Sequence, residues 1–344
     1  MAELWFWLLA LVLGIYAVLD GFDFGVGMLH FLVGKTPAER DTLLRSIGPV
    51  WDGNEVWLVA GGGTLFGAFP ALYATAFSGF YLPLMLVLWL LLFRALGIEL
   101  RHQLHSPLWH QAWDVAFSAS SGLLALFFGA ALGNLVRGLP LNEEGEFFEP
   151  LWTDFRVGEV TGILDWYTLL VGITASAALA LHGSLWLGLK TADELRTRAL
   201  GLAHRLWPAV LALTVATTVA SAVVQPRLTS NLQRYPLGAL LPLLALAGLA
   251  AARVFAVRAP LRAFLGSSAF VLGLIGCAAL AIFPHALPAR VPGRELSIES
   301  VAASDLTLKS MLVWWIPGML LAAGYSFVIY SRLPASFRTS DGEH

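Results

Sequence analysis

Apolar windows of about 20 residues recur along most of the chain, and each is long enough to cross a hydrocarbon core of about 30 Å. Nine such windows are predicted, at about 4–33, 52–69, 74–96, 112–136, 163–189, 204–224, 236–256, 263–284 and 310–331. The connections are short, and the longest are an acidic one at 137–162 and one at 285–309. This pattern predicts an all-α polytopic membrane protein with one integral membrane domain over residues 1–344.

Composition supports this prediction and excludes several other classes. Hydrophobic residues make up 58% of the chain and charged residues 13%, with a mean hydropathy of +0.73. A net charge of −2 argues against a nucleic-acid partner. The single cysteine, Cys277, excludes an intrachain disulfide and a thiolate metal cluster. Glu3 and the long apolar run from Leu4 predict a first span instead of a cleaved signal peptide.

The basic residues suggest an orientation. If the chain spans the membrane nine times with the N-terminus outside, 14 of the 21 Lys and Arg residues fall on the cytoplasmic side. Cytoplasmic loops carry such an excess of positive charge. We therefore expect the N-terminus outside and the C-terminus in the cytoplasm.

The first span carries two acids, Asp20 and Asp23, which are three residues apart and share a helix face. Gly21 and Gly25 beside them form a small-xxx-small pair that allows another helix to approach closely. An ionised Asp near the membrane centre costs about 2.5–3.5 kcal/mol on insertion scales. Two interpretations stay open at this point: the acids hydrogen-bond neighbouring helices, or they form an ion or proton path.

A second acidic pair, Asp52 and Glu55, stands at the start of the second span. Its spacing is that of a helix capping box, with Pro49 just before it. The alternative is an entry point for protons or cations, and a capping carboxylate can also exchange protons. Further along the same span, Gly61–Gly63 are poor helix formers, which predicts close packing against a helix or a bulky ligand.

Other polar positions give weaker signals. His102, His105 and His110 lie within nine residues of one loop, but their spacing favours a solvated loop over a metal site. His182 lies deep in the fifth span, where a hydrogen-bonded helix contact is favoured over haem ligation because no second ligand is placed to complete the pair. Pro83 predicts a kink in the third span, and Asp305 an N-cap for the last.

Several ordered motifs resemble subunit II of the cytochrome bd-type quinol oxidases. They are DGFDFGVG at 20–27, PVWDGNEVWL at 49–58, GAFP at 67–70, FR at 93–94, FP at 283–284 and DLTL at 305–308. The resemblance covers most of the chain and is densest over 17–101. In its compact length and in the segment 65–70, the chain resembles the cyanide-insensitive branch of this family more closely.

The resemblance implies a fold of two four-helix bundles plus one extra helix, in the bacterial cytoplasmic (inner) membrane. It implies a partner, subunit I, that holds two b haems, a haem d (or a haem b in its place) and the quinol-oxidising loop of a respiratory enzyme that reduces oxygen. The chain itself would hold no catalytic residue and no metal. It would support assembly and proton delivery, with a structural quinone or lipid and small single-helix accessory subunits in some members.

Residue by residue, the resemblance assigns Asp52 to cytoplasmic proton entry and places Trp51 beside it. Asp20 and Asp23 match the first-helix acids of the family. Glu55 stands where members have Gln or Glu, and it joins the expected proton pathway. Asn54 and Trp57, in the same motif, are expected to support the pathway or the subunit interface.

Two other functions remain to be separated from this one. A cation-coupled secondary transporter could use the same acids, although such proteins usually show internal repeats, and none is evident here. A purely structural subunit could use the acids only as helix caps.

Overall fold

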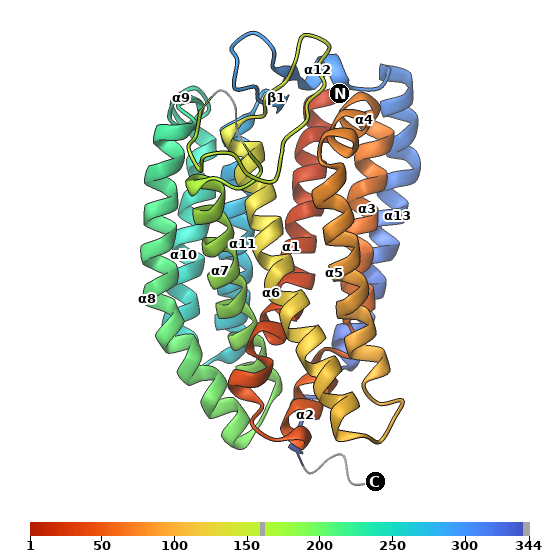
Figure 1. Cartoon of the computed structure of the whole chain (residues 1–344), viewed down its shortest axis with the longest axis vertical. Helices are drawn as coiled ribbons and strands as arrows, with labels where there is room; N and C mark the ends of the chain where they lie inside the picture. The colour runs from red at the N-terminus through yellow and green to blue at the C-terminus, as the bar shows by residue number, and fades with distance from the viewer. Residues whose placement is uncertain (159–161, 340–344) are drawn as a thin grey trace.

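The computed structural model describes residues 1–158 and 162–339. Long helices run side by side along one axis (Figure 1). The elements are α1 (Ala2–Val33), α2 (Pro37–Ile47), α3 (Trp51–Ala68), α4 (Pro70–Gly79), α5 (Tyr81–Leu100), α6 (Pro107–Arg137), α7 (Trp166–Lys190), α8 (Asp193–Val224), α9 (Arg227–Arg234), the 3-10 helix η1 (Pro236–Ala239), α10 (Leu240–Phe255), α11 (Pro260–Ile282), β1 (His285–Leu287), β2 (Leu296–Ser297), α12 (Ile298–Val301) and α13 (Asp305–Arg332).

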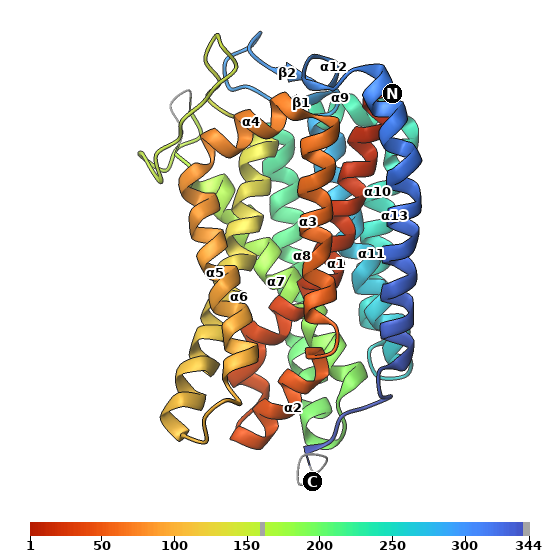
Figure 2. The ribbon, with the colours of Figure 1, turned by 90° about the vertical axis from the view of Figure 1, so that its right-hand side faces the viewer.

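Eight helical segments of the described chain are long and apolar enough to cross a membrane: α1, α5, α6, α7, α8, η1 with α10, α11 and α13. The helix α3 runs alongside α1 and α13 (Figure 2), and it occupies the place of the second predicted span. It is short, and its first turns carry the polar residues Asp52, Asn54 and Glu55. The prediction of an all-α polytopic membrane protein is confirmed.

The molecule has two distinct ends. The short helix α2 marks one end, which we call the α2 end, and the antiparallel pair β1–β2 marks the other, which we call the strand end (Figures 1 and 2). The N-terminus lies at the strand end (Figure 1). The connections predicted to hold 14 basic residues lie toward the α2 end. The assignment of that end to the cytoplasm stays a prediction.

The helices pack as two groups of four. One group holds α1, α3, α5 and α6, the other holds α7, α8, α10 and α11, and α13 lies outside against α3. The groups meet along α7, which packs against both α1 and α6, and where α11 packs against α1. A Cβ atom on Gly25 would lie 2.2 Å from the Leu179 carbonyl oxygen and 2.7 Å from the Gly183 Cα. The close helix approach predicted from Gly21 and Gly25 is therefore present.

Several predicted boundaries were wrong. The third span was expected from 74, but α4 ends at Gly79 and α5 begins at Tyr81, so the chain breaks at Phe80. Pro83 then falls in the first turn of α5, where its missing N–H costs nothing. The sixth span was expected from 204, but α8 begins at Asp193. Its first turns are polar, so hydropathy alone does not detect them.

Two predicted helix caps also differ. The N-cap of α13 is Ser304, whose hydroxyl accepts from the Thr307 N–H, and Asp305 is the first helical residue. The helix α3 begins after Val50 without a side-chain cap. The capping-box interpretation of Asp52 and Glu55 is therefore wrong.

A buried cation ties the acidic 138–165 connection to α6. Arg137 is 1% exposed and pairs with both Asp165 and Glu149. Its Nη2 also donates to the Asn134 side-chain oxygen over 2.7 Å. Asp165 in turn caps α7, accepting from the backbone N–H groups of Tyr167 and Thr168. Part of the negative charge in this connection is thus structural.

Candidate functional site

Asp20 of α1 and Arg94 of α5 form an ion pair in the interior of the first helix group. Both side chains are fully buried. The other Nη of Arg94 contacts the Glu55 carboxylate of α3 at 3.1 Å, and the guanidinium lies 4.6 Å from the centre of the Phe24 ring. One guanidinium therefore joins carboxylates from two other helices. Arginine suits this role because its planar fork holds two acceptors at once.

Asp23 belongs to a neighbouring chain of hydrogen bonds. The Asn54 side-chain amide of α3 donates to Asp23 Oδ2 over 2.8 Å and to the Leu19 carbonyl over 3.1 Å. The Tyr330 hydroxyl of α13 donates to Asn54 Oδ1 over 2.7 Å. Both the nitrogen and the oxygen of the Asn54 side-chain amide are therefore hydrogen-bonded. This chain connects α1 to the last helix through α3.

The acids expected from sequence are brought together in part. Asp20 and Asp23 are fully buried, and Glu55 is 24% exposed beside Arg94. Asp52 is exposed on the first turn of α3, at its α2 end. Asp52 and Glu55 are three residues apart, so they share a helix face one turn from each other. The acids thus run from an exposed position to a buried one.

The two tryptophans of the motif have different surroundings. Trp51 is half-buried against a cluster of apolar side chains that contains Val50 and Ile47. Trp57 is buried with Val12 and Tyr16 of α1. Both pack α3 against its neighbours. The expectation that they support the site or an interface concerns function and stays a prediction.

Asp23 Oδ1 has no hydrogen-bond partner among the described residues, whereas Asp20 also interacts with the Tyr16 hydroxyl of the same helix. A buried carboxylate oxygen without a donor is costly when it is charged, and protonation removes much of that cost. The arrangement can therefore hold protons on carboxylates beside a fixed positive charge. Arg94 itself stays protonated, so it positions the acids without relaying a proton.

His182 does not present a free ring nitrogen. Its Nδ1 is 2.6 Å from the Ser267 hydroxyl and its Nε2 is 3.0 Å from the Val18 carbonyl oxygen. The ring stacks on Phe264 with a centroid separation of 4.7 Å. The surroundings do not fit a haem ligand, because ligation would break one of these bonds. The interpretation as a helix contact between α7, α1 and α11 agrees with this geometry.

The loop histidines lie away from this site. His102 and His105 are exposed, and His110 is half-buried at the start of α6. Among residues 1–158 and 162–339, no three His, Cys, Asp or Glu side chains are grouped as metal ligands would be.

A second ion cluster lies at the α2 end. Asp114 of α6 is buried and accepts from Arg101 Nε over 2.6 Å and Arg40 Nε over 2.8 Å. His30 Nε2 lies 2.7 Å from the same carboxylate, and Arg101 also pairs with Asp41. These contacts hold α1, α2, α5 and α6 together. The cluster balances its charges and closes the first helix group.

Sequence reasoning missed Arg94 and Tyr330 as members of the site. Arg94 had a signal, since an arginine within an apolar run needs a buried partner. Tyr330 had none, because a tyrosine near the end of a span usually marks the membrane interface.

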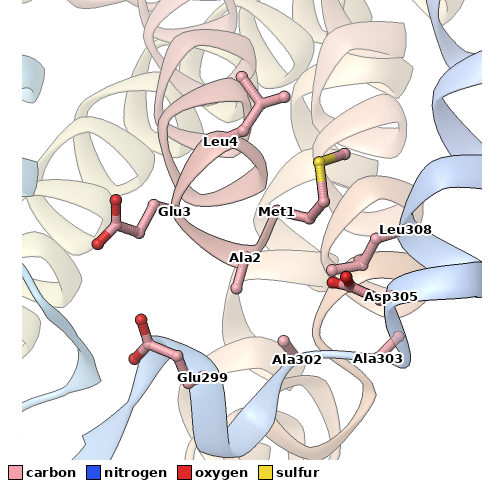
Figure 3. Close-up of a pocket in the computed structure, with 9 residues that line it drawn as sticks. All are labelled: Met1, Ala2, Glu3, Leu4, Glu299, Ala302, Ala303, Asp305 and Leu308. Carbon is pink, nitrogen blue, oxygen red and sulfur yellow. The ribbon is translucent and has the colours of Figure 1, made fainter.

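A cavity lies at the strand end, away from the acids of α1 and α3. It measures about 510 Å³ and lies between the start of α1, α12 and the start of α13. Glu3 and Glu299 lie on one side of it and Met1 and Asp305 on the other (Figure 3). It is not continuous with the Asp20–Arg94 pair, whose side chains do not line it.

Fold and site together define a polytopic helical membrane protein that keeps a carboxylate–arginine cluster within its helices. A family model described as cytochrome bd terminal oxidase subunit II matches residues 1–333. The chain belongs to this family.

Individual relatives agree with this assignment. The chain is 34% identical over 356 residues to a probable cytochrome oxidase subunit 2 of Haemophilus influenzae, covering 95% of this chain and 93% of that one. It is 39% identical over 198 residues to the cytochrome bd-I ubiquinol oxidase subunit 2 of Escherichia coli, covering 57% and 51%. A Bacillus subtilis cytochrome bd ubiquinol oxidase subunit 2 is 33% identical over 220 residues, covering 64% and 62%.

The fold is also similar to a solved structure. A chain in the structure of the bd oxidase from Geobacillus thermodenitrificans superimposes with a TM-score of 0.73, at 16% identity, over 96% of this chain and 97% of that chain. The identification by motifs is confirmed. The alternative of a cation-coupled transporter is not favoured by any of these relatives.

Proposed function

We propose that this chain is the non-haem subunit II of a respiratory quinol:oxygen oxidoreductase, and that it delivers protons toward the oxygen-reducing haem of subunit I. The observation that carries this proposal is the sequence of acids from the exposed Asp52, through Glu55, to the buried Asp20. Oxygen reduction consumes protons at a site buried in the membrane, so a route of ionisable groups is needed.

The route begins on α3. Asp52 collects protons at the α2 end, and Glu55 lies one turn deeper on the same face. Glu55 then shares Arg94 with Asp20, which brings the two carboxylates against a single guanidinium. The fixed positive charge stabilises whichever carboxylate is ionised, so a proton can pass from one to the other at a small difference in free energy.

The orientation follows from the basic residues. Of the 14 Lys and Arg residues predicted for the cytoplasmic side, Arg94 is buried within α5, and the other 13 lie toward the α2 end. With that end in the cytoplasm, Asp52 faces the compartment from which protons are taken. The N-terminus then lies outside, at the strand end.

The face that subunit I would cover is formed by α3 and α13. On α3 the large side chains Val59 and Phe66 are exposed, and on α13 Trp314 and Leu321 are more than two-thirds exposed. Asp52 and Glu55 lie in the first turns of α3, at the α2 end of this face. A partner docked here would contact the helix on which the route begins and would support assembly of the complex.

A groove on this face offers a place for a structural quinone or lipid. It measures about 280 Å³ and is lined by residues of α3 and α13, including Gly53, Trp57, Leu321 and Tyr325. The lining is mainly apolar. The haem b and haem d (or b) groups belong to subunit I in this proposal. The histidine considered for haem ligation in this chain, His182, has both ring nitrogens engaged.

The test is the Asp52→Asn variant of the whole complex, purified with subunit I. We expect oxygen-reduction turnover to fall at least about tenfold, since a positioned proton donor contributes factors of a hundred or more. The haem absorption spectrum should be unchanged, because the substitution leaves the shape of the side chain intact. Asp305→Asn, an exposed aspartate in the first turn of α13, is the matched control and should keep normal turnover.

Normal turnover in a fully assembled Asp52→Asn complex rejects the relay role. The alternative of a purely structural subunit is separated by proton-uptake kinetics. A structural role predicts unchanged uptake in the Asp52→Asn and Glu55→Gln complexes, whereas a relay predicts slower uptake in both.

A further inference from the structure

The second helix group is unusual in its charge. No Asp or Glu occurs between Glu194 and Glu295, a stretch that contains most of α8, all of α9, α10 and α11, and ten arginines. Four of these arginines lie on exposed positions toward the α2 end: Arg205 of α8, Arg253 of α10, Arg258 of the α10–α11 connection and Arg262 of α11. Together with His204 we call them the basic patch.

Three other arginines toward the same end are paired with carboxylates. Arg40 and Arg101 pair with Asp114, and Arg198 of α8 pairs with Glu39 of α2. No arginine of the basic patch forms an ion pair within residues 1–158 and 162–339. The patch therefore presents several positive charges that the described protein does not balance.

Aromatic rings hold two of these guanidinium groups in place. Arg253 lies 5.8 Å from the centre of the Trp207 ring, and its Nη2 is 3.0 Å from His204 Nε2. The indole N–H of Trp207 donates to the Leu249 carbonyl over 2.8 Å, which fixes the ring. Arg262 lies 5.7 Å from the Phe255 ring. Ring contacts order an arginine without cancelling its charge, so its N–H groups stay available to an anion.

The surroundings favour a lipid over a free anion. Large apolar side chains alternate with the arginines on the same hairpin: Val254, Val257 and Leu261 are 67%, 72% and 56% exposed. Further along α10, Leu243 and Leu246 are also more than half exposed. A free phosphate would use only the arginines, whereas a phospholipid would use the charge with its headgroup and the apolar side chains with its acyl chains.

We propose that the basic patch binds the phosphate headgroup of an anionic phospholipid, with the acyl chains lying along α10 and α11. Arg253 and Arg262 provide the ordered donors, since guanidinium groups bind phosphate oxygens in pairs. Arg258, in the connection between them, adds to the positive field. Basic sites between membrane helices bind anionic headgroups in this way. The proposal does not depend on the proton route or on the role of Asp52.

The test uses the purified whole complex, delipidated and then titrated with phosphatidylglycerol or phosphatidylcholine, with retained lipid counted by native mass spectrometry. We expect wild-type complex to retain phosphatidylglycerol in preference to phosphatidylcholine. Each basic residue near an anionic surface contributes about a fivefold gain in binding. The double variant Arg253→Gln/Arg262→Gln should therefore retain phosphatidylglycerol about thirtyfold more weakly.

Arg234→Gln is the matched control. Arg234 is exposed, lies 5.6 Å from the Tyr235 ring and has no described carboxylate partner, but it lies at the strand end. Its variant should bind phosphatidylglycerol like the wild type. Equal retention by the double variant and the wild type overturns the proposal. Competition by inorganic phosphate as strong as that by the lipid overturns the choice of a lipid.

A second measurement does not depend on any variant. Hydrogen exchange of residues 251–264 in the wild-type complex should slow when phosphatidylglycerol is added and should not change with phosphatidylcholine. Equal exchange in both lipids overturns the proposal even if the double variant fails to assemble.

Discussion

The hydroxyl of Tyr330 in α13 donates a hydrogen bond to the side-chain oxygen of Asn54 in α3, over 2.7 Å. The amide of the same Asn54 donates to Asp23. A side chain of the last helix thus reaches an acid of the first helix through one intermediate. Because α13 has little other burial, this bond is an important part of its attachment.

Tyr330→Phe should weaken the docking of α13. The change removes one hydroxyl and keeps the ring, so the expected loss is about 0.5–1.5 kcal/mol of unfolding free energy. Thermal unfolding of the purified complex measures it. Tyr325→Phe is the control, because Tyr325 lies on the same helix, is 59% exposed and has no described hydrogen bond. Equal melting temperatures for the two variants would contradict the importance of the Asn54 contact.

Arg94→Gln should destabilise the first helix group strongly. It leaves the buried Asp20 without its cation, which typically costs about 3–5 kcal/mol. Yield and melting temperature of the complex report the loss. Adding Asp20→Asn to Arg94→Gln should recover part of it, since the double variant buries no uncompensated charge. A double variant that is less stable than Arg94→Gln alone would show that charge balance is not the cause.

Gly25→Ala should disturb the contact between α1 and α7. The new methyl group would lie less than 3 Å from backbone atoms of α7. Backbone atoms cannot relieve this clash by changing a side-chain rotamer. Such overpacking costs about 1–3 kcal/mol. Gly201→Ala in α8 is the matched control, because nothing lies within 4 Å of its Cβ position. That change should stabilise the complex by about 0.5–1 kcal/mol. If Gly25→Ala and Gly201→Ala shift the melting temperature of the complex in the same direction, the prediction is contradicted.

Glu39 should contribute stability that is lost in acid. Partial burial raises the pKa of this carboxyl, but the Arg198 guanidinium and the N–H groups of Thr36 and Lys35 lower it more, so the net pKa is lowered. A lowered pKa means that the contribution is complete above the unfolded-state value, about 4.3, and disappears as the pH falls through the folded-state value.

The difference in melting temperature between wild type and Glu39→Gln should therefore be largest near neutral pH and shrink below about pH 4.3. Glu144→Gln, at an exposed loop position, controls for the loss of a surface charge and should show no such dependence. A difference that stays constant down to the acid limit would exclude the ion pair as its source.

The positions of the long helices could be predicted because hydropathy over 20 residues reports membrane crossing directly. Helix ends were predicted less well: the polar first turns of α8 and the break at Phe80 lie where hydropathy changes little. The spacing of Asp20 and Asp23 predicted that both acids lie on the same face of the first helix. Their partners did not, because Arg94 and Asn54 approach from α5 and α3, and the sequence does not state which helices touch. The capping-box interpretation of Asp52 and Glu55 rested on their spacing, which does not reveal that α3 begins after Val50 or that Glu55 contacts Arg94.

The ion pair between α1 and α5 also has a consequence for biogenesis. Asp20, Asp23 and Arg94 each carry an insertion penalty of about 2.5–3.5 kcal/mol when their helix stands alone in lipid. Two of these charges enter with the first helix, 74 residues before the arginine that balances one of them. The first helix therefore gains its full stability in the bilayer only after α5 has been synthesised. Until then it is best retained beside the insertion machinery, and a chain interrupted before Arg94 would leave a helix that is readily recognised for degradation.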